Sequence, residues 1–157
     1  GELSHLHVPA SFARRAGDVD HDGQLDCDVD HDGDVDEADI RAMTREDAAR
    51  IYRVQWWDRY GYGQFSDSLA TKLLDLGVNM GPDRAHRIFQ QAIHECGVAI
   101  KIDGQLGPQT RLAAIACPEE TLMVEMREAA RAFYLAIIAD NPNCGKYRKG
   151  WIRRALA

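Results

Sequence analysis

Residues 18–39 read DVDHDGQLDCDVDHDGDVDEAD, with ten Asp, one Glu and no Lys or Arg. Eleven acidic residues so close together are typical of a solvated or disordered segment. The regular spacing of the Asp residues indicates a different structure, because alternate side chains can converge on one cation. The rest of the chain is mildly basic in balance, since all 19 Lys and Arg residues lie outside this stretch.

The second half of the stretch has the ligand order of a twelve-residue, EF-hand-like calcium loop. Gly33 takes position 6, where the backbone must turn sharply, and Val35 is the apolar residue at position 8. Position 7, Asp34, is expected to offer its backbone carbonyl. The predicted Ca²⁺ ligands are Asp28, Asp30, Asp32, Asp34, Asp36 and Asp39, with Asp in place of the usual Glu at position 12.

A weaker copy of the same pattern begins at Asp18. Its predicted ligands are Asp18, Asp20, Asp22, Gln24 and Asp26. Position 12 falls on Val29, so the last ligand comes from elsewhere or is missing. The alternative is an acidic solvated linker, and one or two bound ions both fit the pattern. Because the carboxylates repel one another, we expect the segment to become ordered when calcium binds.

Length and composition favour one compact domain over residues 1–157, since 45% of the residues are hydrophobic. No Lys/Arg stripe of the kind that binds nucleic acid is present, and no apolar run is long enough for stable membrane insertion. Four widely spaced cysteines without a CxxC pair argue against zinc and permit two disulfides. Together with calcium they favour an extracytoplasmic location, and we expect a monomer.

Apolar residues recur at helical spacing after the acidic stretch, so the predicted fold class is all-α. The predicted helices span 44–57, 66–80, 82–96, 108–116, 118–140 and, for a turn or two, 150–157. Thr44 to Asp47 resembles a capping box, and residues 98–102 form a bent connection or one strand-like piece. The longest helix is expected to bury Leu122, Met126, Ala129, Ala130, Phe133 and Ile137.

Several motifs then appear in a defined order. They are TREDAARIY (44–52), WD (57–58), LDLGVNMGP (74–82), DGQLGPQT (103–110) and KGWIRR (149–154). The first three resemble the glycoside hydrolase family 108 lysozymes, which are phage and prophage endolysins. The last two resemble the DGxxGPxT turn and the GW segment of the predicted peptidoglycan-binding domain of that family. The resemblance implies a lysozyme-like helical region at 40–97, a peptidoglycan-binding region at 98–157, and bacterial peptidoglycan as substrate or partner.

The family's catalytic Glu lies in a Glu-Gly-Gly motif near the N-terminus, and this sequence has no such motif. Glu2 is the only acidic residue before the loop and is therefore the predicted general acid. Asp58 and Asp75 are the other candidates, because a general acid works best beside apolar groups that hold its proton. Alternatively, the catalytic part lies outside this sequence, or the protein is not catalytic.

Sugar rings stack on aromatic side chains while their hydroxyls meet amides and carboxylates. Trp56, Trp57, Tyr60 and Tyr62 could form such a rim, although the helical period places Trp56 in the core. The predicted substrate-binding residues are Trp57, Tyr60, Asp75 and Asn79.

Three functions fit these patterns. The first is a muramidase in which calcium orders the cleft. The second is a non-catalytic, calcium-dependent peptidoglycan-binding module. The third is a dockerin-like interaction module, because paired Asp loops followed by apolar helices also occur there. The long helical region after Thr44 exceeds what a dockerin-like module needs.

Overall fold

The computed structural model describes residues 17, 18 and 21–157, and these form helices, turns and loops without a strand. The predicted all-α class is confirmed. The contacts divide the chain into two compact units, residues 1–61 and 62–157. Within the described residues, no helix has the length and apolar character needed to cross a membrane.

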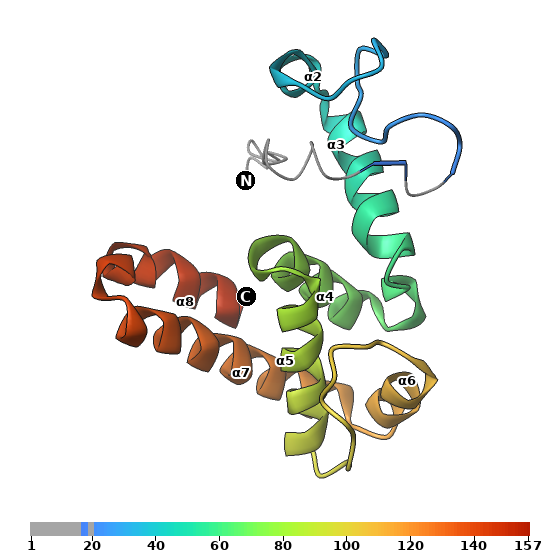
Figure 1. The fold of residues 1–157 in the computed structure, drawn as a ribbon. Helices are drawn as coiled ribbons and strands as arrows, with labels where there is room; N and C mark the ends of the chain where they lie inside the picture. The colour runs from blue at the N-terminus through green and yellow to red at the C-terminus, as the bar shows by residue number, and fades with distance from the viewer. Residues whose placement is uncertain (1–16, 19–20) are drawn as a thin grey trace. The chain divides into compact units, whose positions relative to one another are not determined.

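In the first unit, the Asp-rich stretch leads into three short helical segments (Figure 1). They are α2 (Glu37–Ala42), α3 (Arg45–Tyr52) and η1 (Arg53–Asp58), a π-helical continuation of α3. The capping box predicted at the start of α3 is present, because Thr44 and Asp47 exchange hydrogen bonds. Helix α2 is an unpredicted element that begins inside the acidic loop, with Asp36 as its N-cap.

A small apolar core holds the acidic loop against α3. Cys27, Ala48 and Ile51 are fully buried in it. Packed against them are Val35, Ile40, Met43 and Tyr52. Val35, the apolar residue at loop position 8, therefore anchors the loop to this core.

The second unit contains the remaining helices. The α-helices lie close to their predicted ranges, whereas the two short segments η2 and η3 were not predicted. They are η2 (Tyr62–Gln64), α4 (Asp67–Met80), α5 (Pro82–Glu95), α6 (Pro108–Ile115), α7 (Glu119–Asp140), η3 (Pro142–Tyr147) and α8 (Arg148–Leu156). Helix α4 packs on α5, α5 on α7, and α7 on α8. The chain reverses at η3, so that α8 returns along α7 (Figure 1). Pro82 and Pro108 occupy the first position of their helices, where the missing N–H costs nothing.

The core of the second unit lies between α4, α5 and α7. Its largest fully buried apolar side chains are Tyr62, Leu73, Leu76, Phe89, Ile93, Leu122 and Met126. The buried face of α7 differs in part from the prediction: Ala129, Phe133 and Ile137 are only half-buried, whereas Tyr134, which was not predicted, is buried. The reason is α8: Trp151 stacks on Tyr134 with ring centroids 5.3 Å apart.

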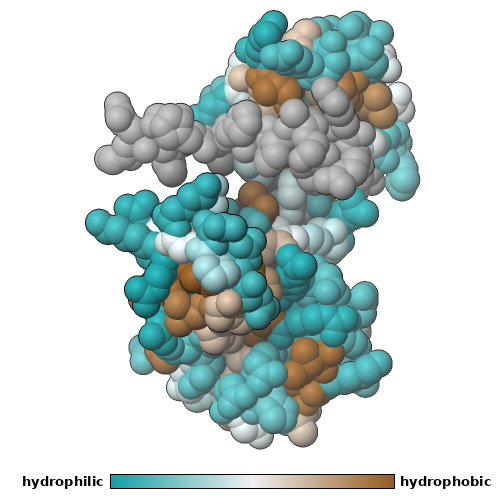
Figure 2. Space-filling view, turned by 60° about the vertical axis from the view of Figure 1, so that its left-hand side comes forward, coloured by the Kyte–Doolittle hydropathy of each residue, from teal (hydrophilic) through white to brown (hydrophobic). Residues whose placement is uncertain are grey.

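Hydrophobic side chains also reach the surface. The exposed large ones among the described residues are Leu112, Ile115, Val124, Tyr147 and Leu156. In the face that Figure 2 shows, hydrophobic residues form separate patches among hydrophilic ones. All four cysteines are free thiols.

Candidate functional site

The loop from Asp28 to Asp39 gathers its six predicted ligands into two groups. Asp28, Asp30 and Asp32 form one group, and Asp34, Asp36 and Asp39 form the other. Within each group, one carboxylate oxygen per residue lies within 4.8 Å of the others. All of these donors are hard oxygens, the ligands that calcium prefers.

Asp28 has two carboxylate oxygens in different environments. The side chain is 5% exposed, and its Oδ2 accepts a hydrogen bond from the Gly33 amide at 3.0 Å. Its Oδ1 is buried and meets no hydrogen-bond donor among the described residues. An unpaired buried anionic oxygen is costly unless a cation or a donor reaches it. The first loop position therefore fits a bound calcium ion.

Asp39, at position 12, ties the two ends of the loop together. It is 1% exposed and accepts the amides of Val29 at 2.6 Å, Asp30 at 3.3 Å and Asp36 at 2.7 Å. Burial acts to raise the pKa of Asp39, but the backbone N–H donors outweigh it and leave the pKa below its ordinary value. Asp39 is therefore held as an anion by the backbone and caps α2 at the same time.

The other carboxylates of the loop repel one another. Desolvation and then the neighbouring Asp32 raise the pKa of Asp30 above its ordinary value. The charge of Asp32 is also the main cause of the raised pKa of Asp34. A divalent cation would supply the positive charge that these side chains lack.

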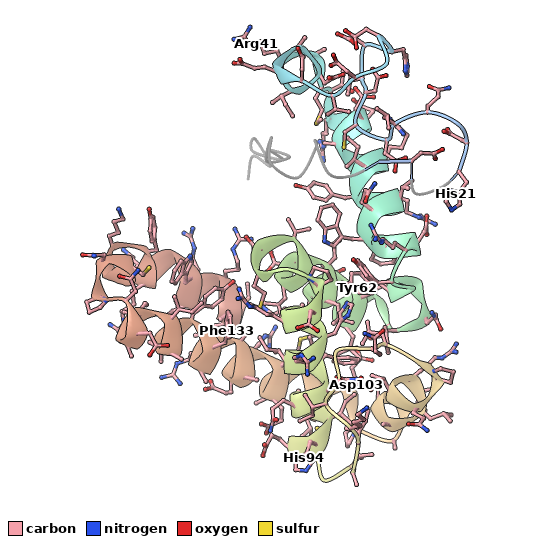
Figure 3. All side chains as sticks on the ribbon, viewed as in Figure 1. His21, Arg41, Tyr62, His94, Asp103 and Phe133 are labelled. Carbon is pink, nitrogen blue, oxygen red and sulfur yellow. The ribbon has the colours of Figure 1, made fainter. Side chains whose placement is uncertain are left out.

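Both copies of the acidic pattern have the same turn. His31 and Gly33 have φ values of 61° and 99°, and their counterparts His21 and Gly23 have 60° and 93°. The Gly23 amide donates to Asp18 at 3.0 Å, as the Gly33 amide does to Asp28. Positive φ favours glycine, which explains Gly at position 6 of each copy. His21 lies on the first copy in Figure 3.

The structure describes the first copy in part. Asp20 lies outside the described residues, and Gln24 is exposed. Asp18 accepts the Asp22 amide at 3.1 Å as well as that of Gly23. Asp26 is 2% exposed and accepts a hydrogen bond of 2.7 Å from Nε2 of Gln55 in η1. This carboxylate therefore fastens the loop to the helical part of the unit.

The candidate catalytic carboxylates differ in what the structure shows of them. Glu2 lies outside the described residues. Asp58 is exposed and accepts two hydrogen bonds from Nε of Arg53, at 2.9 and 3.0 Å. Asp75 is half-buried and paired with Arg154 at 2.9 Å. Both of these aspartates are therefore engaged in ion pairs within the protein.

The predicted sugar-binding residues fall in both units. Trp57 and Tyr60 belong to the first unit and are half-buried, whereas Trp56 is buried beside Tyr52, as predicted. On α4 of the second unit, Asn79 donates to the Asp75 backbone carbonyl at 2.6 Å.

Tyr62, one of the four aromatic residues that could have formed a sugar-stacking rim, is buried. Its side chain is 0% exposed, and its hydroxyl lies 2.9 Å from Nε2 of His86. Tyr62 is therefore not available for such a rim, because its ring fills the core of the second unit.

A buried polar network around α5 was not predicted. The Nδ1 of His86 lies 2.9 Å from the Gly104 carbonyl, and the Gly104 amide donates to Oε1 of Gln90 at 2.7 Å. The Nε2 of Gln90 donates to Asp103 at 3.0 Å and to Thr110 at 3.2 Å. His86 and Gln90 sit one helical turn apart on the apolar face of α5, and that pattern could have indicated the network.

Several residues of the DGQLGPQT motif belong to this network, so the motif forms a structural turn. Figure 3 labels Asp103 of the motif and Tyr62. Gly104 has φ of 79°, and a Cβ there would lie 2.5 Å from Oδ1 of Asp83. The GW motif is likewise structural, because Trp151 stacks between Tyr134 and Tyr147, with centroid distances of 5.3 and 5.5 Å.

Two family models match consecutive parts of the chain. Residues 11–81 match the glycosyl hydrolase 108 family, and residues 84–156 match the family described as a predicted peptidoglycan domain. The chain is therefore similar to glycosyl hydrolase 108 proteins in its first half and to that peptidoglycan domain in its second. This agrees with the resemblance carried by the sequence motifs.

One solved structure to which the chain is similar is that of Brucella abortus SagA. The two chains are 23% identical with a TM-score of 0.64, and the likeness covers 77% of this chain and 64% of that chain. At this identity the likeness shows a common fold, and the chain spans less than two thirds of SagA. No match was found among curated protein sequences.

Proposed function

We propose that this chain acts on bacterial peptidoglycan as a lysozyme-type glycoside hydrolase whose first unit is ordered by calcium. The observation that carries the proposal is the order of the two matches, a glycosyl hydrolase 108 region directly followed by a peptidoglycan domain. A hydrolase that holds its polymeric substrate gains effective concentration from such a second region. An extracytoplasmic site of action follows from this substrate.

Hydrolysis of a glycosidic bond needs a carboxylic acid that protonates the leaving oxygen. Glu2 remains the proposed general acid, since Asp58 and Asp75 are both paired with arginine. Trp57 and Tyr60 remain the proposed sugar-stacking residues, and Asn79 a proposed polar contact.

Calcium would be held by the carboxylates of the Asp28 to Asp39 loop, where the unpaired Oδ1 of Asp28 supports a cation. The ion would supply charge compensation and fix the loop. Because Val35 and Cys27 pack on α3, a fixed loop also fixes the start of the helical part of the first unit.

The test is the release of soluble muropeptides from purified peptidoglycan sacculi, in calcium and in excess chelator. We expect release in calcium, a lower rate in chelator, and loss of release in the Glu2→Gln variant. No release by the wild-type protein in either condition would contradict the proposed hydrolase activity.

A second candidate function is a calcium-dependent peptidoglycan-binding module without catalysis. It is favoured by the peptidoglycan domain match, which covers most of the second unit. Co-sedimentation with insoluble sacculi separates the two proposals. Binding without the appearance of new reducing ends supports this second function, whereas binding with new reducing ends supports the hydrolase.

A further inference from the structure

A groove of about 840 Å³ lies among α4, α7 and α8 of the second unit. Its lining comprises Asp67, Ser68, Thr71, Lys72 and Asp75 of α4, Met123 and Arg127 of α7, and Gly150, Arg153, Arg154 and Ala157 at α8. Four of these side chains are cationic and two are anionic. The groove therefore favours a ligand that carries negative charge.

Two of the four cations, Lys72 and Arg154, join α4 to α8. Lys72 is 6% exposed, and its Nζ donates to the backbone carbonyls of Arg154 and Ala155, both at 2.8 Å. Arg154 is paired with Asp75 at 2.9 Å. These contacts fix α8 against α4 and give the groove a defined wall.

The other two cations keep unused donors. Arg127 donates through Nη2 to the Ala157 carbonyl at 2.8 Å, while its buried Nε meets no acceptor among the described residues. The exposed side chain of Arg153 makes no ion pair with the described residues. Guanidinium groups bind carboxylates through paired N–H donors, so Arg127 and Arg153 are suited to hold an anionic group.

The lining also indicates which part of peptidoglycan the groove suits. No aromatic side chain belongs to it, so it lacks the flat surface on which a sugar ring stacks. Instead it offers guanidinium groups for carboxylates and the hydroxyls of Ser68 and Thr71 for peptide amides. The carboxylate of Asp67 could meet an ammonium group. Charges of both signs match a short peptide better than a neutral glycan.

We infer that this groove binds the carboxylate-bearing peptide arms of peptidoglycan, with Arg127 and Arg153 as the contacts to the carboxylates. The inference rests on the proposed function for the identity of the polymer. It gives the second unit a role separate from hydrolysis, because the ligand is the peptide and not the glycosidic bond.

The test is calorimetric binding of three soluble probes to the full chain: a disaccharide-tetrapeptide, the free tetrapeptide, and the disaccharide without peptide. We expect the two peptide-bearing probes to bind with similar affinity and the disaccharide to bind about tenfold more weakly. Arg153→Gln should weaken binding of the tetrapeptide about tenfold. Arg148→Gln removes the same charge from α8 outside the groove and should leave the affinity within about twofold.

Stronger binding of the bare disaccharide than of the tetrapeptide would overturn the inference, and so would equal losses in the two arginine variants. Retained release of muropeptides by Arg153→Gln, with tetrapeptide binding unaffected, would defeat the inference while leaving the proposed hydrolase standing. Tetrapeptide binding that depends on Arg153, in a protein that releases nothing from sacculi, would defeat the hydrolase and leave the inference intact.

Discussion

The Asp28 side chain is buried, and its Oδ1 has no hydrogen-bond partner among the described residues. This single residue is the main support for the proposed calcium site. The Asp28→Asn variant removes a charge where a cation would sit, so its affinity for calcium should fall about tenfold or more. Glu37→Gln is the matched control, because Glu37 is exposed and paired with Arg41. Competition with a calcium-sensitive dye measures the calcium affinity of both variants. Equal affinities in the wild type and Asp28→Asn would contradict the assignment of this ligand.

His86 predicts how the second unit responds to pH. Burial lowers its pKa below the ordinary value of 6.5, although the hydrogen bond to Gly104 and the charge of Asp83 act in the opposite direction. The unfolded chain then binds more protons than the folded one in the window below pH 6.5. The stabilising contribution is complete above pH 6.5 and is lost as the pH falls through the lowered pKa.

Urea unfolding at pH 7.5 and 5.5 should therefore show a lower free energy of unfolding at the acidic pH. A difference of one bound proton between the unfolded and folded states changes the free energy of unfolding by at most about 1.4 kcal/mol per pH unit. The His86→Gln variant should lose part of this dependence, whereas His94→Gln, an exposed position on the same helix (Figure 3), should keep it. An unchanged pH dependence in His86→Gln would refute this role.

At the scale of the element, the acidic loop depends on glycine at its turn. Gly33 has φ of 99°, so the Gly33→Ala variant should lose about 1–2 kcal/mol of stability through backbone strain. Gly150 lies inside α8 with open space around a Cβ, and Gly150→Ala should gain about 0.5–1 kcal/mol. Urea unfolding in the presence of calcium measures the stability of both variants. If both substitutions changed the free energy of unfolding in the same direction, the positive φ of Gly33 would not explain the effect of Gly33→Ala.

Lys72 of α4 donates hydrogen bonds to two backbone carbonyls in the last turn of α8. Lys72→Met keeps the apolar stem but removes both hydrogen bonds to Arg154 and Ala155, which should cost about 1.5–3 kcal/mol. Burial lowers the pKa of Lys72, so the ammonium is already held at some cost in the wild type. Faster amide exchange in α8, with α5 unaffected, is the expected readout. Unchanged exchange in α8 would show that the lysine does not hold this helix.

The elements that the sequence predicted well are those governed by local rules. Thr44, Pro82 and Pro108 begin helices as their chemistry requires, and the apolar stripe of α5 is buried. Tertiary contacts decided what the sequence did not predict. Tyr62 is buried by its contact with His86, and Asp26 by its bond to Gln55, partners that lie 24 and 29 residues away along the chain.

For the candidate sites too, local features were predicted and distant ones were not. The spacing of the Asp residues was enough to predict the Asp28 to Asp39 loop, because its ligands are close together in the sequence. The groove among α4, α7 and α8 draws on residues from 67 to 157, and no local pattern joins them. From the sequence, its Lys and Arg residues contribute only to the mildly basic balance of the chain outside the acidic stretch.

At the scale of the whole molecule, the chain forms two units with separate cores, and the proposed calcium site lies entirely in the first. A ligand that binds only the folded form stabilises the part that contains its site, by about 2.7 kcal/mol at 100 times its dissociation constant. Calcium should therefore act on residues up to 61 and leave the helices of the second unit unchanged.

Amide hydrogen exchange with and without calcium distinguishes a calcium-ordered first unit from an unaffected one. We expect slower exchange with calcium in the loop 28–39 and in α3, where Val35 and Cys27 pack, and no change across residues 62–157. Identical exchange in the loop with calcium and with chelator would contradict this expectation.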